Sequence, residues 1–317
     1  MVPGAGRSST RLTMRQLQTH INQPANSPAR VNPPIRGSFR VAAIQEPWHG
    51  SIDKQKNELR MAVELAAKER PELIVLPELS LYPYACTKPD AQKYFFPEAL
   101  EGMSFTFAQE LAAFSGAHIL ISLYEDALDG KFNTAIIVSP SGEMVLKTRK
   151  THIPVTAGYY EDKYFEVGDS SPSTISINSA KVGSPTCWDQ WFPELAREYG
   201  LINTDILCYP TAIGSEPDHP GFDTEPLWRQ MMVAHGIANG LFVIAVNRSG
   251  TEDGVTFYGS SFISDPYGRV LLRAAREGSA VLIADLDLDE KRDWLELFPF
   301  FKTRRPEMYK KIADSAR

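Results

Sequence analysis

Short apolar runs alternate with segments of helical pattern along this chain of 317 residues, and the alternation limits the possible folds. The runs are rich in Val, Ile and Leu, as is typical of strands that are buried in a sheet. Several of the segments between them have apolar residues at helical spacing, for example Leu59, Val63 and Ala66. Strands that alternate with helices, together with hairpin-like insertions, predict an α/β fold in which helices cover mixed sheets.

The pattern predicts strands at 39–45, 72–76, 118–123, 133–138, 143–150, 173–177, the run into residue 187, 205–209, 241–247, 261–263, 269–272 and 280–286. It predicts helices at 51–69, 104–114, 193–199, 226–239 and 289–298.

The composition is that of an ordinary globular protein, with 43% hydrophobic and 23% charged residues and a net charge of −6. The charge gives no reason to expect a nucleic acid as partner. No apolar run approaches the roughly 20 residues that a membrane helix needs. The three cysteines are too few for a disulfide framework and fit a reducing compartment, so we expect a cytoplasmic protein. The histidines form no close pair with the spacing of zinc ligands, so we expect no metal site.

Residues 1–38 differ from the rest, because they carry several Arg, Ser and Pro residues but no acidic residue, the first being Glu46. We expect a disordered leader at 1–38 and a single catalytic domain at 39–317. The same composition is also found in organelle transit peptides, which we regard as the less favoured alternative.

Three reactive side chains follow predicted strands, where open α/β sheets usually place their sites. Glu78 comes directly after an apolar strand and Pro77, Lys150 ends another strand, and Cys187 precedes a helix that starts at Pro193. Singly, they fit a surface carboxylate, a solvated strand end and a buried structural cysteine. Together they suit acyl transfer, with a base, a cation for an oxyanion and a nucleophile.

The motifs Leu-Pro-Glu78-Leu, Arg-Lys150-Thr-His-Ile-Pro and Cys187-Trp-Asp-Gln-Trp-Phe-Pro-Glu resemble, in order and separation, those of the nitrilase superfamily of carbon–nitrogen hydrolases. The resemblance implies a four-layer α-β-β-α sandwich of two mixed sheets. The cysteine motif, residues 209–217 and Gly158-Tyr-Tyr-Glu161 are similar to the N-carbamoylputrescine amidase branch. In that branch the glutamate at the position of Glu161 is a fourth catalytic-site residue.

The resemblance implies that Glu78 takes the proton of Cys187 and that the thiolate attacks a carbamoyl or amide carbonyl. Lys150 and the backbone N–H of Trp188 would stabilise the oxyanion. Glu161 would place the hydrolytic water or orient Lys150. No metal and no other cofactor is implied. Superfamily members usually self-associate through helices near the site, so we expect a homodimer or a higher homo-oligomer.

Two departures from the family pattern bear on specificity. Residues 183–186 read Gly-Ser-Pro-Thr where an aliphatic strand is usual, and Pro185 removes a backbone donor before the nucleophile. The residues on both sides of Gly158, at 156–157 and 162–163, also differ from the usual ones.

The substrate stays open between three classes: N-carbamoyl amines such as N-carbamoylputrescine, N-carbamoyl amino acids, and simple amides. Glu216 and Asp218 lie in an acidic loop that favours a cationic amine, and Trp188 and Tyr84 are further candidates for substrate binding. Arg248 is the candidate for holding a carboxylate instead. A catalytically silent binding protein on the same fold is less favoured, because none of the implied catalytic residues is missing.

Overall fold

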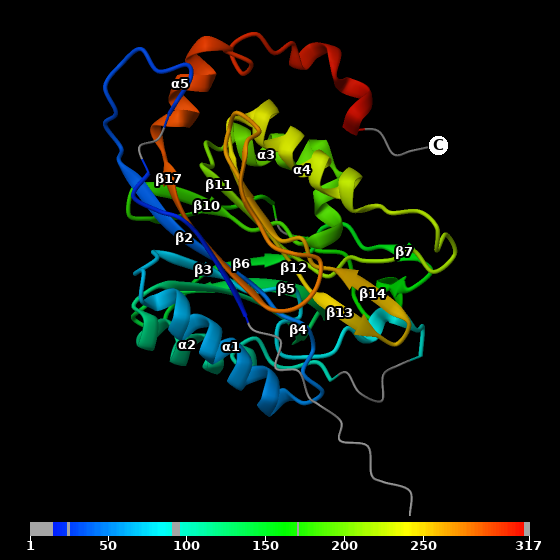
Figure 1. Cartoon of the computed structure of the whole chain (residues 1–317). Helices are drawn as coiled ribbons and strands as arrows, with labels where there is room; N and C mark the ends of the chain where they lie inside the picture. Colours follow the sequence, from blue (N-terminus) through cyan, green and yellow to red (C-terminus); the bar gives the residue numbers. More distant parts are fainter. Residues whose placement is uncertain (1–14, 24–25, 91–95, 170, 314–317) are drawn as a thin grey trace, which may run out of the picture.

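The structure of the protein is a computed structural model, in which residues 15–23, 26–90, 96–169 and 171–313 are described. Two sheets are stacked face to face and helices cover both outer faces, so the layers run α-β-β-α (Figure 1). The four-layer sandwich of mixed sheets predicted from the sequence is therefore confirmed.

The first sheet consists of β1 (Gln16–His20), β2 (Ser38–Gln45), β3 (Leu73–Val75), β4 (His118–Ala127), β5 (Gly130–Val138), β6 (Met144–Arg149) and β17 (Ala280–Asp287). Their order across the sheet is β1-β17-β2-β3-β4-β5-β6. The central strands β2, β3 and β4 run parallel, whereas β5 and β6 return as antiparallel neighbours.

The second sheet consists of β9 (Ile175–Ile177), β10 (Ala180–Gly183), β11 (Ile206–Thr211), β12 (Phe242–Asn247), β15 (Phe262–Ser264) and β16 (Val270–Arg273). Their order is β16-β15-β12-β11-β10-β9, with a parallel centre formed by β10, β11 and β12. The strand predicted to run into Cys187 ends earlier, at Gly183, because Pro185 has no N–H with which to continue the ladder.

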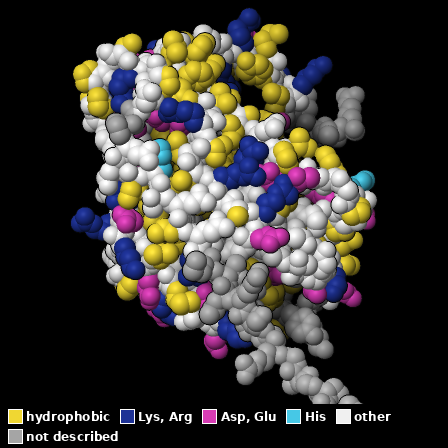
Figure 2. Space-filling view, viewed as in Figure 1, with side chains coloured by type: hydrophobic (Ala, Val, Ile, Leu, Met, Phe, Trp, Pro, Cys, Tyr) yellow, Lys and Arg dark blue, Asp and Glu magenta, His cyan; other side chains and the backbone are white. Residues whose placement is uncertain are grey.

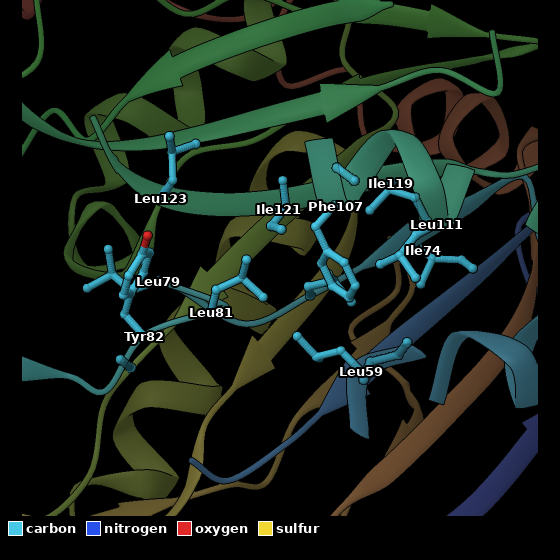
Figure 3. Packing of buried hydrophobic residues seen from close by; sticks show 14 of the residues in the cluster. Leu59, Ile74, Leu79, Leu81, Tyr82, Phe107, Leu111, Ile119, Ile121 and Leu123 are labelled. Atoms are coloured by element: carbon cyan, nitrogen blue, oxygen red, sulfur yellow. The ribbon is translucent and has the colours of Figure 1, made fainter. Parts of the chain in front are cut away.

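The helices are α1 (Ile52–Ala67), α2 (Met103–Ser115), α3 (Pro193–Leu201), α4 (Glu225–Asn239) and α5 (Asp289–Leu297). The first two pack on the outer face of the first sheet, where Leu59 of α1 and Phe107 and Leu111 of α2 meet Ile74 and Ile119 (Figure 3). Helices α3 and α4 cover the second sheet through a separate apolar cluster that includes Tyr199 and Trp228.

A third cluster fills the space between the sheets, where Val41, Val75 and Leu120 belong to the same core as Ile206 and Ile244. Each of these side chains is fully buried, and full burial of a Val, Ile or Leu contributes about 1.5–3 kcal/mol. This core holds the two sheets, and hence the strand ends of both, in a fixed relation.

The remaining elements are short. They are β7 (Val155–Thr156), β8 (Tyr159–Tyr160), β13 (Ser249–Glu252), β14 (Val255–Tyr258), η1 (Ala85–Thr87), η3 (Glu161–Lys163), η4 (Cys187–Trp191), η5 (Pro306–Met308) and η6 (Lys310–Ala313). Across the described ranges, no helix is both long and apolar enough to cross a membrane.

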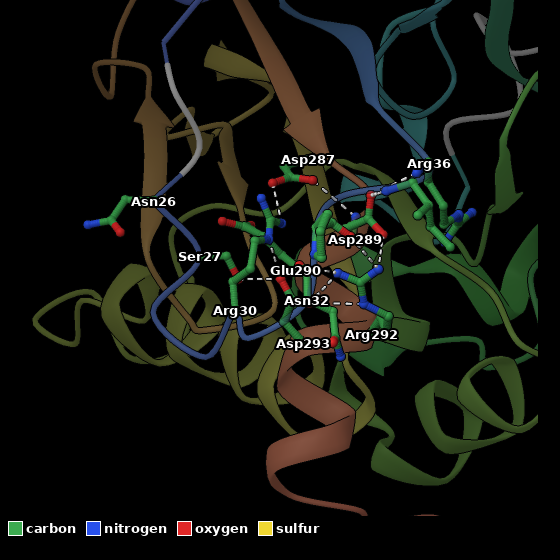
Figure 4. A network of polar contacts seen from close by, with 12 residues as sticks. Asn26, Ser27, Arg30, Asn32, Arg36, Asp287, Asp289, Glu290, Arg292 and Asp293 are labelled. Carbon is green, nitrogen blue, oxygen red and sulfur yellow. Dashed lines mark hydrogen bonds and ion pairs between the residues drawn. The ribbon is translucent and has the colours of Figure 1, made fainter.

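The segment before residue 39 packs on the domain wherever it is described, so the disordered leader expected for residues 1–38 is wrong for that part. Strand β1 adds to the edge of the first sheet and pairs in parallel with β17. Beyond it, Arg30 forms ion pairs with Asp287 and Asp293, at 2.5 and 2.7 Å (Figure 4). This segment is held by backbone pairing and by ion pairs. The prediction of disorder depended on the lack of an apolar run, and these two kinds of contact do not require one. Residues 1–14 and 24–25 lie outside the described residues.

Arg36 provides another of these attachments. Its guanidinium donates to both carboxylate oxygens of Asp205, at 2.8 and 2.7 Å, and Asp205 is only 2% exposed. Burial opposes ionisation of this carboxylate, but the hydrogen bond from Arg36 lowers the pKa of Asp205 below its usual value. The N-terminal segment is thereby joined to the start of β11.

We predict that Arg36→Ala lowers the free energy of unfolding by about 1–3 kcal/mol, because Asp205 loses a charged partner. Thermal unfolding would show this as a fall of a few degrees in Tm. Arg60→Ala is the matched control, since its ion pair with Glu110 is exposed on both sides, at 42% and 56%, and contributes little. Equal Tm values for the two variants would contradict a stabilising role for the N-terminal segment.

Candidate active site

Four of the residues singled out in the sequence meet at one end of the stacked sheets. Glu78 lies just after β3, Lys150 directly follows β6, and Glu161 begins η3. Cys187 begins η4, in the loop between β10 and α3. Glu78 follows β3 of the first sheet, whereas Cys187 follows β10 of the second sheet. The site is therefore assembled from both sheets of the sandwich.

Lys150 lies at the centre of a buried charge cluster. Its ammonium nitrogen Nζ is 2.9 Å from Glu78 Oε1 and 2.7 Å from Glu161 Oε2. All three side chains are 0% exposed. An ammonium carries three N–H groups, and among the described residues it donates two of them to these carboxylates.

The two glutamates differ in how their oxygens are satisfied. Both oxygens of Glu161 are used, because Oε1 accepts from the hydroxyl of Tyr84 at 2.6 Å and Oε2 accepts from Lys150. In Glu78, Oε1 accepts from Lys150 and also from Asn133 Nδ2 at 2.7 Å. Oε2 of Glu78 is buried and has no hydrogen-bond partner among the described residues. The cluster therefore has one vacant carboxylate oxygen.

The ionisation of the cluster follows from burial and from mutual charge. Burial opposes the charge of Lys150, but the neighbouring Cys187, Glu161 and Glu78 raise the pKa of its ammonium well above the usual value. Burial, opposed in part by Lys150 and reinforced by Glu78, raises the pKa of Glu161 to about 7. Burial and the Glu78 carboxylate raise the pKa of the Cys187 thiol. The thiol therefore needs a base beside it to become a thiolate.

The backbone at Cys187 has a conformation that L-residues rarely adopt. Its φ of +40° lies in the left-handed region, which costs about 1–3 kcal/mol and occurs mainly at functional sites. Asp189, 1% exposed, supports this turn, since its Oδ2 accepts from the N–H of Thr186 at 3.0 Å. Its Oδ1 accepts from the N–H of His152 at 2.9 Å, two residues beyond Lys150. Asp189 thus joins the cysteine turn to the segment that carries the lysine.

A pocket of about 110 Å³ opens beside the thiol. The residues of its wall that matter for the chemistry are Tyr159, Glu161, Cys187, Trp188, Trp191 and Glu216. None of the described residues that line it is an arginine or a lysine. The pocket is therefore bounded by aromatic rings and carboxylates.

The structure brings two of the four predicted substrate-binding residues to this wall, namely Trp188 and Glu216. Tyr84 is 1% exposed and lies behind Glu161, to which it donates, so it reaches the cluster but does not line the pocket. Asp218 is exposed and is not part of the lining. The substrate-binding roles expected of Tyr84 and Asp218 therefore have no support in the geometry.

Arg248, the candidate for holding a substrate carboxylate, is occupied elsewhere. Its side chain is 1% exposed and pairs with Glu252 at 2.7 Å. It also donates to the carbonyls of Leu79 and Tyr82, and Glu252 accepts from the backbone N–H of Tyr84. The pair therefore holds the loop after Glu78 against β13.

Sequence reasoning missed Asn133 and Asp189 as parts of the site. Asn133 is fully buried in β5 just before the apolar run 135–138, and Asp189 is buried in the cysteine motif. A polar residue at a position where an apolar one is expected signals a buried hydrogen bond. That signal was present in both segments of the sequence.

The comparisons with known proteins agree with this geometry. A model of the carbon-nitrogen hydrolase family matches residues 40–295, and the chain belongs to that family, as its nitrilase-superfamily motifs indicate. It is a carbon–nitrogen hydrolase, an enzyme class whose members act on small amides.

Similar proteins are found in bacteria and plants. A citrullinase of Francisella tularensis subsp. tularensis is 34% identical over 280 residues, 87% of this chain and 98% of that protein. An N-carbamoylputrescine amidase of Solanum tuberosum is 36% identical over 282 residues, 85% of this chain and 93% of that protein. The crystal structure of a carbon-nitrogen hydrolase from Helicobacter pylori has a TM-score of 0.80 at 30% identity and covers 88% of this chain and 100% of that one.

We predict that iodoacetamide modifies Cys187 before the other two cysteines. Cys187 lines the pocket and is 4% exposed, whereas Cys86 and Cys208 are 0% exposed. Peptide mass spectrometry after partial labelling would measure the order, and Cys187→Ala serves as the control for site assignment. First labelling of Cys86, with activity lost in parallel, would overturn the assignment of the nucleophile.

Proposed function

We propose that this enzyme hydrolyses the carbamoyl group of an N-carbamoyl amine, with N-carbamoylputrescine as the substrate and putrescine, ammonia and carbon dioxide as the products. The observation that carries the proposal is the buried Glu78–Lys150–Glu161 cluster beside Cys187, at a pocket whose wall carries Glu216. The similarity to N-carbamoylputrescine amidases supports the same substrate, and would give the enzyme a role in polyamine synthesis.

In the proposed mechanism Cys187 is the nucleophile and Glu78 is the base. The vacant Oε2 of Glu78 supports this choice between the two glutamates, because both oxygens of Glu161 already accept hydrogen bonds. The thiolate attacks the carbamoyl carbon, and the third N–H of Lys150 and the backbone N–H of Trp188 stabilise the oxyanion. The leaving nitrogen then takes the proton from Glu78 as the C–N bond breaks.

Cys187 then carries a thiocarbamate, which one water molecule hydrolyses to carbamate and the free thiol. Carbamate decomposes to ammonia and carbon dioxide. Glu161 acts in this second half by orienting Lys150 and the water.

We predict different defects for the two glutamates. Glu78→Gln removes the base, so the thiocarbamate forms more slowly and kcat/KM falls by about a hundredfold or more. Glu161→Gln leaves the base in place but slows hydrolysis of the intermediate, which then accumulates and is seen as a mass increase of the intact protein. Glu161→Gln with the turnover of the parent enzyme would remove Glu161 from the mechanism.

The pKa of Glu161 allows the parent enzyme and Glu161→Gln to be compared as a function of pH. Because burial raises this pKa to about 7, the carboxyl is ionised above that pH and becomes neutral below it. Protonation weakens its ion pair with Lys150, so turnover limited by the second step should decrease as the pH falls through about 7. The Gln variant should lack this decrease.

The outer wall of the pocket supports an amine rather than an acid as the distal group of the substrate. Burial raises the pKa of Glu216, so its charged form would gain from an ammonium close by. Arg248, the cation considered for a carboxylate, is engaged with Glu252. Citrulline has the same chain as N-carbamoylputrescine with an added α-carboxylate, for which the described lining offers no cation.

We therefore predict a higher kcat/KM for N-carbamoylputrescine than for citrulline or N-carbamoyl-β-alanine. Glu216→Gln should lower kcat/KM for the amine by roughly ten- to a hundredfold, the value of a charge-assisted contact. The exposed Asp218→Asn, in the same loop, is the matched control and should leave the rate unchanged. Ammonia release measures all three, and a preference for either acid would refute the amine assignment while leaving the catalytic residues intact.

Simple amides are the second candidate substrate, because the pocket of about 110 Å³ is small. A preference for acetamide-sized substrates in the same ammonia assay would favour them.

We also propose that the chain forms a homodimer or a higher homo-oligomer, as its superfamily resemblance implies. Side chains of the C-terminal region support an interface there, since Leu297, Phe298 and Met308 are 57%, 47% and 67% exposed. Hydrophobic side chains gather over α5 and the C-terminal segment at the top of the space-filling view (Figure 2). Such a surface is typical of a protein–protein contact.

A further inference from the structure

Asn133 touches two of the proposed catalytic residues but has no role in the mechanism above. It belongs to β5 and is 0% exposed. Its side-chain Nδ2 donates to Glu78 Oε1 at 2.7 Å, and its backbone carbonyl accepts from the N–H of Lys150 at 2.8 Å. One residue thus sets the position of the carboxylate and of the lysine backbone.

The direction of the hydrogen bond to Glu78 is determined by a chain of bonds behind it. The backbone N–H of Leu79 donates to Ser122 Oγ at 3.1 Å, and Ser122 Oγ donates to Asn133 Oδ1 at 3.3 Å. A backbone N–H can only donate, so Ser122 must accept there and has its own hydrogen for Asn133. The carbonyl end of the Asn133 amide is therefore engaged by Ser122, and its NH₂ end faces Glu78.

This chain leads from Leu79 back to the neighbouring residue Glu78. It supplies a second donor to Oε1, which already accepts from Lys150, while Oε2 stays buried without a partner. A buried carboxylate oxygen with no donor is costly and needs an explanation. The explanation that the contacts support is that Oε2 is kept vacant to receive a proton.

We propose that Asn133 is a positioning residue, which commits Oε1 of Glu78 to hydrogen bonds from Asn133 and Lys150 and leaves Oε2 to take the proton of Cys187. The inference rests on the proposed function, through the role of Glu78 as the base. In the reaction the S–H bond of Cys187 breaks, an O–H bond forms at Oε2, and the electron pair stays on sulfur.

Removing the Asn133 amide should have two effects. Lys150 alone would hold the carboxylate, which could then rotate and exchange its two oxygens. The ionised form of Glu78 would also lose a donor, among neighbours that include Lys150, Glu161, Cys187, Tyr84 and Cys86. With Oε2 no longer held free for the proton of Cys187, less of the Cys187 thiolate is present at a given pH.

The test measures the rate at which iodoacetamide alkylates Cys187 as a function of pH, followed by peptide mass spectrometry. It reports thiolate formation directly and needs no substrate. Asn133→Leu, similar in size but without the amide, should alkylate roughly tenfold or more slowly near neutral pH, with the acid limb moved to higher pH. In turnover, kcat should fall with KM little changed, because Asn133 does not belong to the pocket lining.

Thr134→Val is the matched control. Thr134 is the next residue of β5 and its hydroxyl donates at 2.6 Å to Glu125, a buried carboxylate that takes no part in the site. This variant loses a comparable hydrogen bond in the same strand and should alkylate like the parent enzyme. If Asn133→Leu and Thr134→Val slowed the alkylation of Cys187 equally, the effect would be that of losing any buried hydrogen bond in β5, and the proposal would be overturned.

Ser122→Ala is a milder second variant, which keeps the Asn133 amide but frees its carbonyl end. It should shift the acid limb in the same direction by a smaller amount, and it tests the proposal if Asn133→Leu does not fold. An unchanged pH profile in Asn133→Leu or in Ser122→Ala would contradict the proposal.

Glu78→Gln, measured in the same way, separates the two claims. Alkylation that is slow in Glu78→Gln but normal in Asn133→Leu would refute the positioning role alone. Alkylation that is normal in Glu78→Gln would refute the base itself, and with it both claims.

Discussion

Two carboxylates and an ammonium that are buried together in the protein interior must be nearly fully paired, because each unpaired charge there costs several kcal/mol. Lys150 and Tyr84 together meet this requirement for Glu161, whereas Lys150 pairs with only one oxygen of Glu78 and leaves its Oε2 vacant. Pairing therefore holds the cluster together, and the one unmet requirement marks where a proton can be accepted. The surrounding structure holds the three charged side chains in place, so that Oε2 of Glu78 does not find another partner.

The support comes from polar residues that act on the backbone around the cluster. Asp189 ties the turn of Cys187 to the segment after Lys150. Arg248, directly after β12 of the second sheet, and Glu252 of β13 hold the loop between Glu78 and Tyr84. These attachments cross between the two halves of the sandwich, so the site depends on the apolar core that fixes the sheets against each other. Asp189 also supports the turn at Cys187, whose positive φ L-residues do not favour.

The sequence predicted the layers, because buried strands can be recognised from their apolar runs. It also predicted that Glu78, Lys150 and Cys187 meet, because the family motifs that contain them are long. It did not predict β1, whose five residues alternate in exposure without an apolar run and pair with β17 near the other end of the chain. Nor could the partners of Arg248 be predicted, since an arginine after a strand fits a ligand-binding role and a structural one equally well. Contacts between distant segments decide such cases, and a local pattern does not encode them.

Charge also separates the residues proposed for catalysis from the residue proposed for substrate selection. In the proposed mechanism Lys150, Glu78 and Cys187 act on a carbonyl group, which carbamoyl amines, carbamoyl acids and amides all possess, so these three residues would not discriminate among the substrates. Discrimination requires a group farther along the wall, and Glu216 accepts only a hydrogen bond from Thr224 at 3.3 Å through its side chain among the described contacts. An ammonium would supply donors to this half-buried carboxylate, whereas an acid would add like charge. In this proposal specificity and catalysis are separable properties of the site, because Glu216 would govern the first and Glu78 and Glu161 the second.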